Sequence, residues 1–512
     1  MKKRQFLQNA AVLTGTSLLL KVIGIFFRIW MSGHLGAEGM GLHQLIFSVY
    51  VLGSTLATTG LSTAVTRLVT EAAATGNQRA IPRVMRRSLI LTLALSLASS
   101  AVFYLAAPWI GRWWIADVRA IPALRVLTIG FPFMGISACL KGYFYARRRA
   151  ELPSIAQIFE QVTRIFITMW LFFQTAEPTI TTLSAAVMLG DVISEGLSAG
   201  LAGVLYAFER DRVSPDTPHS TNDRDFRTGR LVRIAAPITA GRYLNTILRT
   251  IENIQVPRSL ALFSGSQELG LAAFGNLKGM AMPLIFFPSS FLSAFSTLLI
   301  PEMSEAMALS QHLRVRHTAD ITIRITMAAS WLCAGCFWVF AYPLGQLLYN
   351  SDEVGFYLQV LAPLVPLMYL ESVVDGILKG LNQQTRSLKY SLLDSGLRIA
   401  LILLLVPKLG IRGFLYIMVV SNLLTCLLNT GRLCRVASVP MDFGKWILRP
   451  LSALLIAGSL AHLLVAQTPI RTMSNFWIVA LGCTILALVY LFLLFATKTF
   501  TQRDYSILKK KS

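Results

Sequence analysis

The chain of 512 residues is 54% hydrophobic and only 14% charged, and its mean hydropathy is +0.59. Soluble domains carry about 25% charged residues, so this composition excludes an ordinary soluble enzyme and indicates a polytopic membrane protein. The net charge of +22 would suit nucleic-acid binding, but the basic residues fall in alternate loops and do not gather on one face, which argues against that function.

Apolar runs of roughly 20 residues repeat along the chain, each long enough to cross about 30 Å of hydrocarbon. Because an unpaired backbone is costly in lipid, these runs should be α-helices. The sequence predicts an all-α membrane protein with about fourteen transmembrane helices. The first run is expected to be a retained helix and not a signal peptide, because Lys21 interrupts its apolar segment. The predicted spans are residues 10–31, 42–71, 88–108, 121–146, 153–173, 181–206, 231–257, 272–300, 322–345, 357–380, 387–406, 412–431, 447–466 and 475–496.

The loops between these spans alternate in charge. Odd-numbered loops contain few Lys or Arg residues, whereas the other loops and both ends of the chain carry basic clusters. By the positive-inside rule, both termini are expected in the cytoplasm of a bacterium, with the protein in its cytoplasmic membrane. The basic clusters are residues 2–4, 79–87, 147–149, 210–233, 314–316, 432–435 and 509–511.

The chain resembles itself at a constant offset of 234 residues. LGAEGMG (35–41) falls on LGLAAFG (269–275), and LSTAVTRLVTEA (61–72) falls on FSTLLIPEMSEA (295–306). Gly142 falls on Gly376 at the same offset. The offset spans six helices, an even number, so both halves start on the same side of the membrane and form a parallel pseudo-twofold repeat around a cavity.

This repeat predicts the domain organisation. Residues 1–207 form an N-lobe of six helices, and residues 208–230 form a polar cytoplasmic linker. Residues 231–434 form a C-lobe of six helices. Residues 435–512 contain helices 13 and 14 and a basic tail.

Four basic residues lie inside predicted spans, in two pairs with the same spacing. Lys21 and Arg28 are seven residues apart on the first helix, and Arg242 and Arg249 repeat this spacing on the seventh. A charge at the bilayer centre costs about 2.5–3.5 kcal/mol on insertion scales, so such residues are candidates for function. Residues seven apart lie on nearly the same helix face. The polar stripe on the seventh helix also contains Asn245, Glu252 and Asn253.

Cations that line a water-filled cavity favour an anionic substrate, and arginine binds phosphate with two parallel hydrogen bonds. We therefore expect Lys21, Arg28, Arg242 and Arg249 to bind phosphate groups of a substrate. Buried ion pairing is the alternative for Lys21, Arg242 and Arg249, and snorkelling to the interface is the alternative for Arg28. Arg67, near the inner end of helix 2, either guides an anion into the cavity or faces lipid headgroups.

Acidic residues inside the spans have two possible roles. Glu160 with Arg164 and Asp394 with Arg398 are spaced i, i+4 in both halves, which predicts structural ion pairs. The remaining acids are candidates for coupling transport to Na⁺ or H⁺, or for balancing basic residues. They are Asp191 and Glu195 on helix 6, and Glu371 and Asp375 on helix 10, where Lys379 lies one turn beyond Asp375.

The sequence predicts no cofactor or metal site. Cys333 and Cys336 have the spacing of a metal or redox motif, but they lie in an apolar span with no second pair, so helix packing is the expected role. No Walker A loop, nucleophile elbow or dinucleotide fingerprint is present. An intramembrane glycosyltransferase would need a large external loop with acids, and the external loops are short.

The stretch KVIGIFFRIWMSGHLGAEGMGLHQL (21–45), followed by TTGLSTAVTRLVTEAAATGN (58–77), closely resembles the opening of the stage V sporulation protein B and polysaccharide exporter family. This family belongs to the multidrug/oligosaccharidyl-lipid/polysaccharide (MOP) flippase superfamily, which includes lipid II flippases. In lipid II flippases, arginines on helices 1, 2 and 8 receive the pyrophosphate. Lys21, Arg28 and Arg67 lie in the similar stretches of helices 1 and 2, whereas the helix 8 position has no evident match, since Lys278 lies near the end of that helix.

The resemblance implies a monomeric flippase that moves an undecaprenyl-pyrophosphate-linked saccharide, such as a lipid II-like precursor or a polysaccharide repeat unit, by alternating access. It also implies that helices 13 and 14 hold the polyprenyl tail. The alternatives are a cation-coupled multidrug exporter of the same fold and a scaffold within a cell-wall assembly complex. Lys21 and Arg28 argue against an exporter of organic cations, which would need acids on the first helix.

Overall fold

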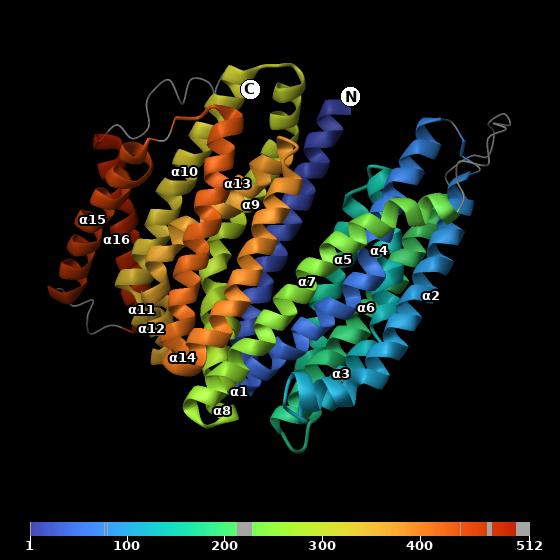
Figure 1. The fold of residues 1–512 in the computed structure, drawn as a ribbon, viewed down its shortest axis with the longest axis horizontal. Coiled ribbons are helices and arrows are strands. Elements are labelled where there is room, and N and C mark those ends of the chain that lie inside the picture. Colours follow the sequence, from blue (N-terminus) through green and yellow to red (C-terminus); the bar gives the residue numbers. More distant parts are fainter. Residues whose placement is uncertain are drawn as a thin grey trace. The chain divides into compact units, whose positions relative to one another are not determined.

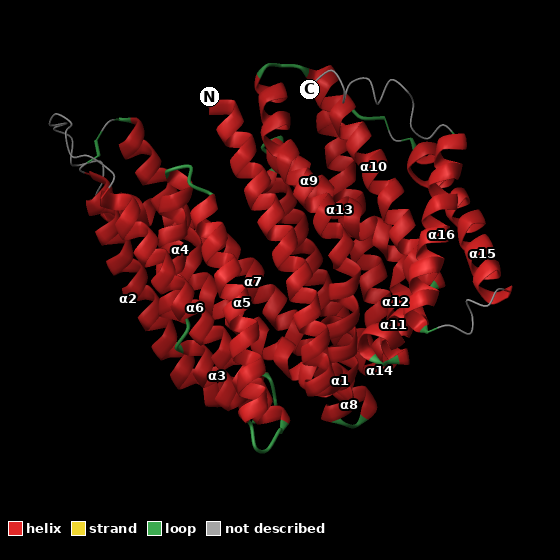
Figure 2. Ribbon diagram, turned by 180° about the vertical axis from the view of Figure 1, so that it is seen from behind, coloured by secondary structure: helices red, strands yellow, loops and turns green. Residues whose placement is uncertain are grey.

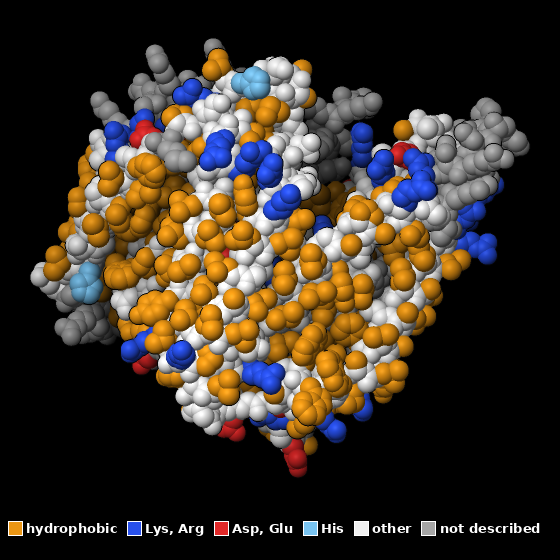
Figure 3. Space-filling model, in the orientation of Figure 1, with side chains coloured by type: hydrophobic (Ala, Val, Ile, Leu, Met, Phe, Trp, Pro, Cys, Tyr) orange, Lys and Arg blue, Asp and Glu red, His pale blue; other side chains and the backbone are white. Residues whose placement is uncertain are grey.

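The computed structural model describes residues 2–497 except 76, 79, 212–227, 441 and 468–473. Every regular element in these ranges is a helix (Figures 1 and 2), which confirms the all-α prediction. Most of the predicted linker (208–230) and the basic tail at 509–511 lie outside the described residues. Hydrophobic side chains cover much of the visible surface, and most Lys and Arg side chains lie toward the helix ends (Figure 3), as expected for a multi-pass membrane protein.

Contacts divide the chain into two compact units, which are described separately. Unit 1 consists of residues 1–27 and 34–272, and unit 2 consists of residues 28–33 and 273–512, as far as these are described. The predicted lobe boundaries at 207 and 231 stay a prediction, and helix α7, which follows the linker, makes its contacts within unit 1. The elements of unit 1 are α1 (Lys2–Ala74), α2 (Ala80–Trp109), η1 (Ile110–Trp114), α3 (Ala120–Thr128), α4 (Phe131–Ala146), α5 (Glu151–Gln174), α6 (Ile180–Asp211), α7 (Thr228–Ser264) and most of α8 (Gln267–Phe274).

Unit 2 has its own core, formed by apolar residues of four helices. Helices α9, α10, α13 and α14 supply these residues, and α15 and α16 pack together against α10 and α11. The elements of unit 2 are η3 (Gly275–Ala281), α9 (Met282–Ala308), α10 (His312–Val339), α11 (Ala341–Tyr349), α12 (Asp352–Leu361), η4 (Ala362–Leu364), α13 (Val365–Gly380), α14 (Gln384–Ala437), η5 (Gly444–Leu448), α15 (Arg449–Gln467) and α16 (Asn475–Ala496).

Two helices, α1 and α14, are far longer than one membrane span because each joins two predicted spans. The junction in each is a glycine with positive φ, Gly36 (66°) and Gly410 (59°), a conformation that a side chain would strain. Nine described helices are long and apolar enough to cross a membrane, or ten if the bent pair α3–α4 counts as one span. The count of fourteen crossings stays a prediction.

Several predicted spans contain a break in the structure, among them 121–146 between α3 and α4 and 322–345 between α10 and α11. The sequence predicts a single span over 322–345, but α10 ends at Val339 and a second helix begins at Ala341. Phe340 between them has φ −109° and ψ 24°, outside the helical range. Its side chain is buried in the cluster with α15 and α16, so packing by helices far along the chain accompanies a break that the apolar pattern does not reveal.

The internal repeat is visible in equivalent contacts within the two units. In unit 1, Gly142 of α4 faces Ser62 of α1 so closely that a Cβ there would lie 2.7 Å from the Ser62 carbonyl oxygen. In unit 2, Gly376 of α13 faces Ser296 of α9, and a Cβ there would overlap the serine hydroxyl. Both residues of each pair are 234 positions from their counterparts, which confirms the predicted repeat.

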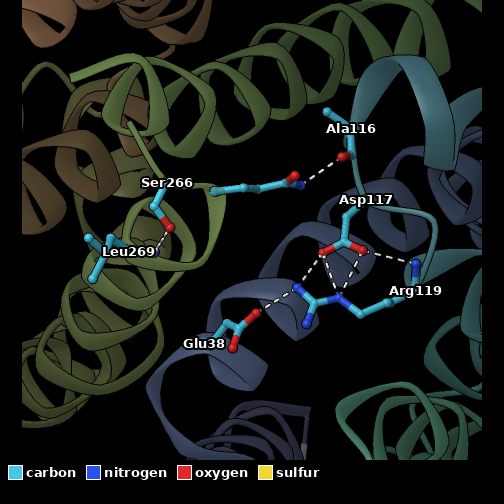
Figure 4. A network of polar contacts seen from close by, with 7 residues as sticks. Glu38, Ala116, Asp117, Arg119, Ser266 and Leu269 are labelled. Carbon is cyan, nitrogen blue, oxygen red and sulfur yellow. Dashed lines mark hydrogen bonds and ion pairs between the residues drawn. The ribbon is translucent and has the colours of Figure 1, made fainter. Parts of the chain in front are cut away.

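A polar network braces the turns at one end of unit 1 (Figure 4). Arg119 Nη2 lies 2.6 Å from Glu38 Oε1, just after the break at Gly36, and 2.8 Å from Asp117 Oδ2. The hydrogen bonds with Asp117, and then those with Glu38, raise the pKa of Arg119. Gln267, in the first turn of α8, donates a hydrogen bond to the Ala116 carbonyl at 2.6 Å.

The close contact at Gly142 predicts a stability effect. Gly142→Ala would push α4 away from the α1 backbone, and we expect it to lower the stability of the protein by about 2 kcal/mol. Gly200→Ala on α6 is the control, because no atom lies within 4 Å of its added Cβ and alanine favours helix by up to about 1 kcal/mol. Thermal unfolding of the purified variants in detergent measures both, and equal melting temperatures would contradict the packing.

Candidate functional site

The two cations of the first helix have different surroundings. Lys21 is exposed and makes no hydrogen bond or ion pair with any residue in the described ranges. Arg28 is half-buried, and it belongs to the short segment 28–33 that packs in unit 2. The sequence places Lys21 and Arg28 on one helix face, and the structure assigns them to segments with different contacts.

The two arginines of α7 are also exposed and without partners. Neither Arg242 nor Arg249 forms a side-chain hydrogen bond or an ion pair in the part of the chain that the structure describes. They are seven residues apart and therefore lie on nearly the same face of the helix. Together with Lys21, they are three cations of unit 1 whose charge no described carboxylate neutralises.

Helix α7 holds its position by packing on the second half of α1. The Gly60 backbone approaches the Ala235 carbonyl and the Thr239 hydroxyl so closely that no Cβ fits there. Asn253 Nδ2 donates to Ser48 Oγ at 3.0 Å, and Thr250 Oγ1 donates to the Ser48 carbonyl at 3.3 Å. The predicted polar stripe is therefore divided. Asn253 packs on α1 and Glu252 is buried, whereas Asn245 bonds the backbone of its own helix and the arginines remain exposed.

Arg67 lies on the surface in a salt bridge. Its Nε is 3.3 Å from Glu71 Oε1, and the arginine side chain is 62% exposed. Arg230 pairs with the other oxygen of Glu71 at 2.8 Å. An exposed pair of this kind contributes at most about 1 kcal/mol. The role of Arg67 in guiding an anion or meeting lipid headgroups stays a prediction.

A buried charge cluster occupies the interior of unit 1. Arg164 Nη2 lies 2.7 Å from Glu160 Oε1, the i, i+4 pair that the sequence predicts, and Arg164 Nε lies 2.7 Å from Asp191 Oδ1 of α6. Lys141 Nζ of α4 lies 3.7 Å from Glu160 Oε2. Glu195, one turn beyond Asp191 on α6, lies on the same helix face and is only 5% exposed. The structure thus joins a predicted ion pair and two predicted coupling acids into one cluster.

The charges of this cluster do not balance. Three carboxylates meet two cations, so one carboxylate lacks a counter-charge. Glu195 is that carboxylate, because no described Lys or Arg side chain lies within salt-bridge distance of it.

Unit 2 contains a related cluster built from the equivalent helices. Asp394 Oδ1 accepts a hydrogen bond from Ser421 Oγ at 2.6 Å, and Arg398 Nη1 lies 3.9 Å from Asp394 Oδ2. Glu371 Oε2 accepts from Thr425 Oγ1 at 2.8 Å. Nearby, the Asp375 carboxylate pairs with Lys379 Nζ and accepts from Ser387 Oγ, both at 2.6 Å.

The two clusters carry different residues at equivalent positions of the repeat. The offset of 234 places Lys141 on Asp375, and Asp191 and Glu195 on Thr425 and Asn429. Each cluster nevertheless has three carboxylates and two cations. The buried Asn429 Oδ1 has no hydrogen-bond partner among the described residues. No group of three or more described His, Cys, Asp or Glu side chains is placed to hold a metal ion.

An apolar pocket of about 590 Å³ lies between α10, η4 and α15 in unit 2. Trp331, Trp338 and Leu455 form much of its wall, and Gly458 leaves room at its centre. Its few polar side chains include Gln359 and His462. Its lining residues come from α10, α12, η4 and α15, and α15 covers the predicted span 447–466. Whether helices of the predicted spans 447–466 and 475–496 hold a polyprenyl tail stays a prediction.

The structure also shows the surroundings of Lys278, Cys333 and Cys336, which the sequence analysis singled out. Lys278, the one cation near the expected helix 8 position, lies in the π-helical turn η3, with its ammonium 5.7 Å from the centre of the Phe414 ring. Cys333 and Cys336 are free thiols within α10. Sequence reasoning missed Lys141, although the repeat offset from Asp375 pointed to it.

The comparisons with known proteins agree with this architecture. The family model described as polysaccharide biosynthesis protein matches residues 6–307.

The chain belongs to the polysaccharide biosynthesis protein family.

A second model, MatE, matches residues 259–404. Stage V sporulation protein B of Bacillus subtilis (strain 168) is 26% identical to this family member over 456 residues, which are 88% of this chain and 87% of the relative. Lipid II flippase MurJ of the same organism is 19% identical over 402 residues, or 74% and 73% of the two chains. These matches confirm the resemblance on which the sequence analysis relies.

Solved structures share the fold. The lipid II flippase MurJ in an inward closed conformation has a TM-score of 0.71 at 14% identity, with 95% of this chain and 99% of that chain covered. An inward-facing multidrug resistance MATE family transporter of the MOP superfamily has a TM-score of 0.65 at 16% identity, with 84% and 100% covered. The protein therefore has the fold of the MOP superfamily.

The unit 1 cluster predicts opposite effects for two similar substitutions. Glu160→Gln removes the carboxylate that Lys141 and Arg164 share, and we expect it to cost about 3 kcal/mol of stability. Glu195→Gln removes a buried carboxylate that has no salt-bridge partner among the described residues, so its stability should equal or exceed that of the wild type. Thermal unfolding in detergent measures both. An equal loss for Glu195→Gln would mean that Glu195 is instead a charged partner of the cations.

Proposed function

We propose that this protein is a flippase that moves an undecaprenyl-pyrophosphate-linked saccharide across the bacterial cytoplasmic membrane by alternating access, with both termini in the cytoplasm. The observation that carries this proposal is the set of three cations, Lys21, Arg242 and Arg249, that have no counter-charge among the described residues. In an apolar chain, such cations need either water or an anionic ligand to offset their cost. A lipid-linked pyrophosphate supplies that anion.

The relatives support the same substrate class. Two matching proteins carry the names stage V sporulation protein B and lipid II flippase, and the family is that of polysaccharide biosynthesis. A lipid II-like wall or spore-cortex precursor and a polysaccharide repeat unit share the pyrophosphate that the cations would bind. We therefore propose that the protein recognises the pyrophosphate group, which is common to these lipids whatever sugar they carry. It describes a transporter that works as a monomer and is not an enzyme.

A multidrug exporter of organic cations is the second candidate, favoured by the MATE structures of the same fold. Its site would need accessible carboxylates. In unit 1, Glu160 and Asp191 are instead engaged by Arg164 and Glu195 is only 5% exposed, whereas Lys21, Arg242 and Arg249 are exposed. A scaffold in a cell-wall assembly complex would not require these cations at all.

The two acid clusters are suited to couple transport to an ion. Each has one carboxylate more than its cations neutralise, so each can take up one H⁺ or Na⁺ when the chain changes conformation. We propose that Glu195 with Glu160 takes a proton in unit 1. In unit 2, Glu371, Asp394, Thr425 and Asn429 offer oxygen atoms to either ion.

The pocket beside Gly458 is the proposed place for part of the polyprenyl tail. Its volume of about 590 Å³ and its Trp and Leu walls suit an isoprenoid chain, and its polar side chains are few. A long isoprenoid buried against such walls contributes about 25 cal/mol for each Å² of apolar surface.

The head-group proposal predicts the effect of removing the α7 cations. In vesicles containing purified protein, wild type should move lipid II between leaflets, measured by its protection from an external modifying enzyme. We expect Arg242→Gln with Arg249→Gln to slow this movement at least about 10-fold, because each lost hydrogen bond to a charged group is worth about 1.5–3 kcal/mol. Arg258→Gln, another exposed arginine on α7, is the control and should move lipid II normally.

Two outcomes would contradict the head-group proposal. If wild type leaves lipid II in its original leaflet but moves a cationic dye, the protein is an exporter and not a lipid flippase. If the double variant moves lipid II as fast as Arg258→Gln does, Arg242 and Arg249 do not bind the pyrophosphate group of lipid II.

The tail proposal predicts a dependence on chain length. Gly458→Phe would fill the pocket, so it should slow movement of a lipid II with its full-length C55 tail but spare a C15 analogue that does not reach the pocket. Leu460→Phe is the control, because Leu460 is an exposed residue of the same helix outside the pocket. The same leaflet assay measures both lipids. Equal slowing of the two lipids would show that the pocket does not hold the tail.

A further inference from the structure

Lys141 of α4 is a cation that the fold brings to the acid cluster of unit 1. Its Nζ lies 3.7 Å from Glu160 Oε2, and the lysine side chain is 19% exposed. Ser198 Oγ of α6 lies 3.4 Å from the same carboxylate oxygen. The other oxygen of Glu160 is held by Arg164, whose Nη2 lies 2.7 Å from Oε1. Lys141 is therefore the cation that faces Glu160 Oε2.

Lys141 supplies charge to this cluster more than it fixes the helices. Arg164 already joins α5 to α6, since it lies 2.7 Å from both Glu160 and Asp191, a distance typical of strong charge-assisted hydrogen bonds. The separation of 3.7 Å at Lys141 is longer than a direct hydrogen bond. A lysine ammonium is a point charge on a flexible stem and imposes no fork geometry. A small monovalent cation beside Oε2 would supply the same charge.

The equivalent position in unit 2 carries the opposite charge. The offset of 234 places Glu160 on Asp394 and Lys141 on Asp375. The Asp375 carboxylate is itself paired with Lys379, at 2.6 Å. Because a carboxylate occupies this place in unit 2, the packing shared by the two halves does not require a cation there. The lysine at position 141 is therefore a feature of the charge cluster of unit 1.

We propose that Lys141 is a tethered cation that keeps Na⁺ out of the unit 1 cluster and restricts this cluster to a proton. Carboxylate and hydroxyl oxygens are ligands that hard cations prefer, and Glu160 Oε2 and Ser198 Oγ are two such atoms. An ammonium on the same chain competes with free Na⁺ at an effective concentration in the millimolar range. Lys141 therefore takes the place beside Glu160 that Na⁺ would otherwise occupy.

The remaining carboxylate suits a proton. With Lys141 beside Glu160 and Arg164 beside Asp191, the surplus negative charge is that of Glu195, which is only 5% exposed. A proton neutralises a buried carboxylate without further ligands, whereas a metal cation needs several oxygen atoms around it. This inference rests on the proposed function, because it names Lys141 as the residue that determines which ion the proposed transporter takes up in unit 1.

Equilibrium binding of radioactive Na⁺ to the purified full-length protein in detergent tests the role of Lys141. Glu195→Gln leaves two carboxylates and two cations in the cluster, so it should bind as much Na⁺ as the wild type. Adding Lys141→Met to Glu195→Gln frees Glu160 Oε2 and restores one surplus carboxylate. We expect this double variant to bind one more Na⁺ for each protein molecule than Glu195→Gln alone.

Two further variants show whether the charge at position 141 is responsible. Lys141→Arg in the Glu195→Gln background keeps a cation beside Glu160 and should abolish the additional Na⁺. Lys389→Met in the same background is the matched control, because it removes a lysine at an exposed position of α14 and should leave Na⁺ binding unchanged. A merely structural role of Lys141 would not add a bound ion when the lysine is replaced.

Two results would overturn the inference. The first is that the folded variant with Lys141→Met and Glu195→Gln binds no more Na⁺ than Glu195→Gln. The second needs no change at Lys141: if Glu195→Gln binds one Na⁺ fewer than the wild type, then unit 1 already binds Na⁺ beside Lys141. Failure of the proposed function would look different, because wild type would leave lipid II in its leaflet while replacement of Lys141 still added a bound Na⁺.

Discussion

The cost of an unneutralised charge in a membrane governs this structure. Most intramembrane charges of the described chain lower that cost with a partner at short range, as Arg164 does with Glu160 and Asp191. Lys21, Arg242 and Arg249 are exposed and have no ion-pair partner among the described residues. Each acid cluster, in turn, keeps one carboxylate more than its cations neutralise. We propose that the exposed cations receive an anionic head group and that the surplus carboxylates receive a coupling ion.

The two halves of the internal repeat share a close helix-packing contact, but their charged residues differ. The glycine–serine contacts at Gly142 and Gly376 are the same in both units, because two helices can approach closely only where no Cβ intervenes. The charged positions are not the same, since Lys141 corresponds to Asp375 and Asp191 to Thr425. Even so, both clusters keep the same surplus of one carboxylate. The backbone contact fixes where the helices lie, and the individual charges are free to change as long as their balance is kept.

The sequence predicts the parts of the fold that local pattern controls. Apolar periodicity places the helices, the offset of 234 places Gly142 and Gly376, and the i, i+4 spacing places Arg164 beside Glu160. It does not reveal the contact of Lys141 with Glu160, because these residues are on different helices and only tertiary packing brings them together. The break at Phe340 is hidden because the chain remains apolar across it.

The assignment of α1 to both units has a mechanical consequence. A single continuous helix begins in one unit, enters the other for six residues and returns before the kink at Gly36. Because the helix is continuous through residues 27–34, the backbone hydrogen bonds of one helix connect the segment that packs in unit 2 with the segments that pack in unit 1. A helix-breaking substitution within residues 28–33 would therefore disturb the contacts of α1 in both units.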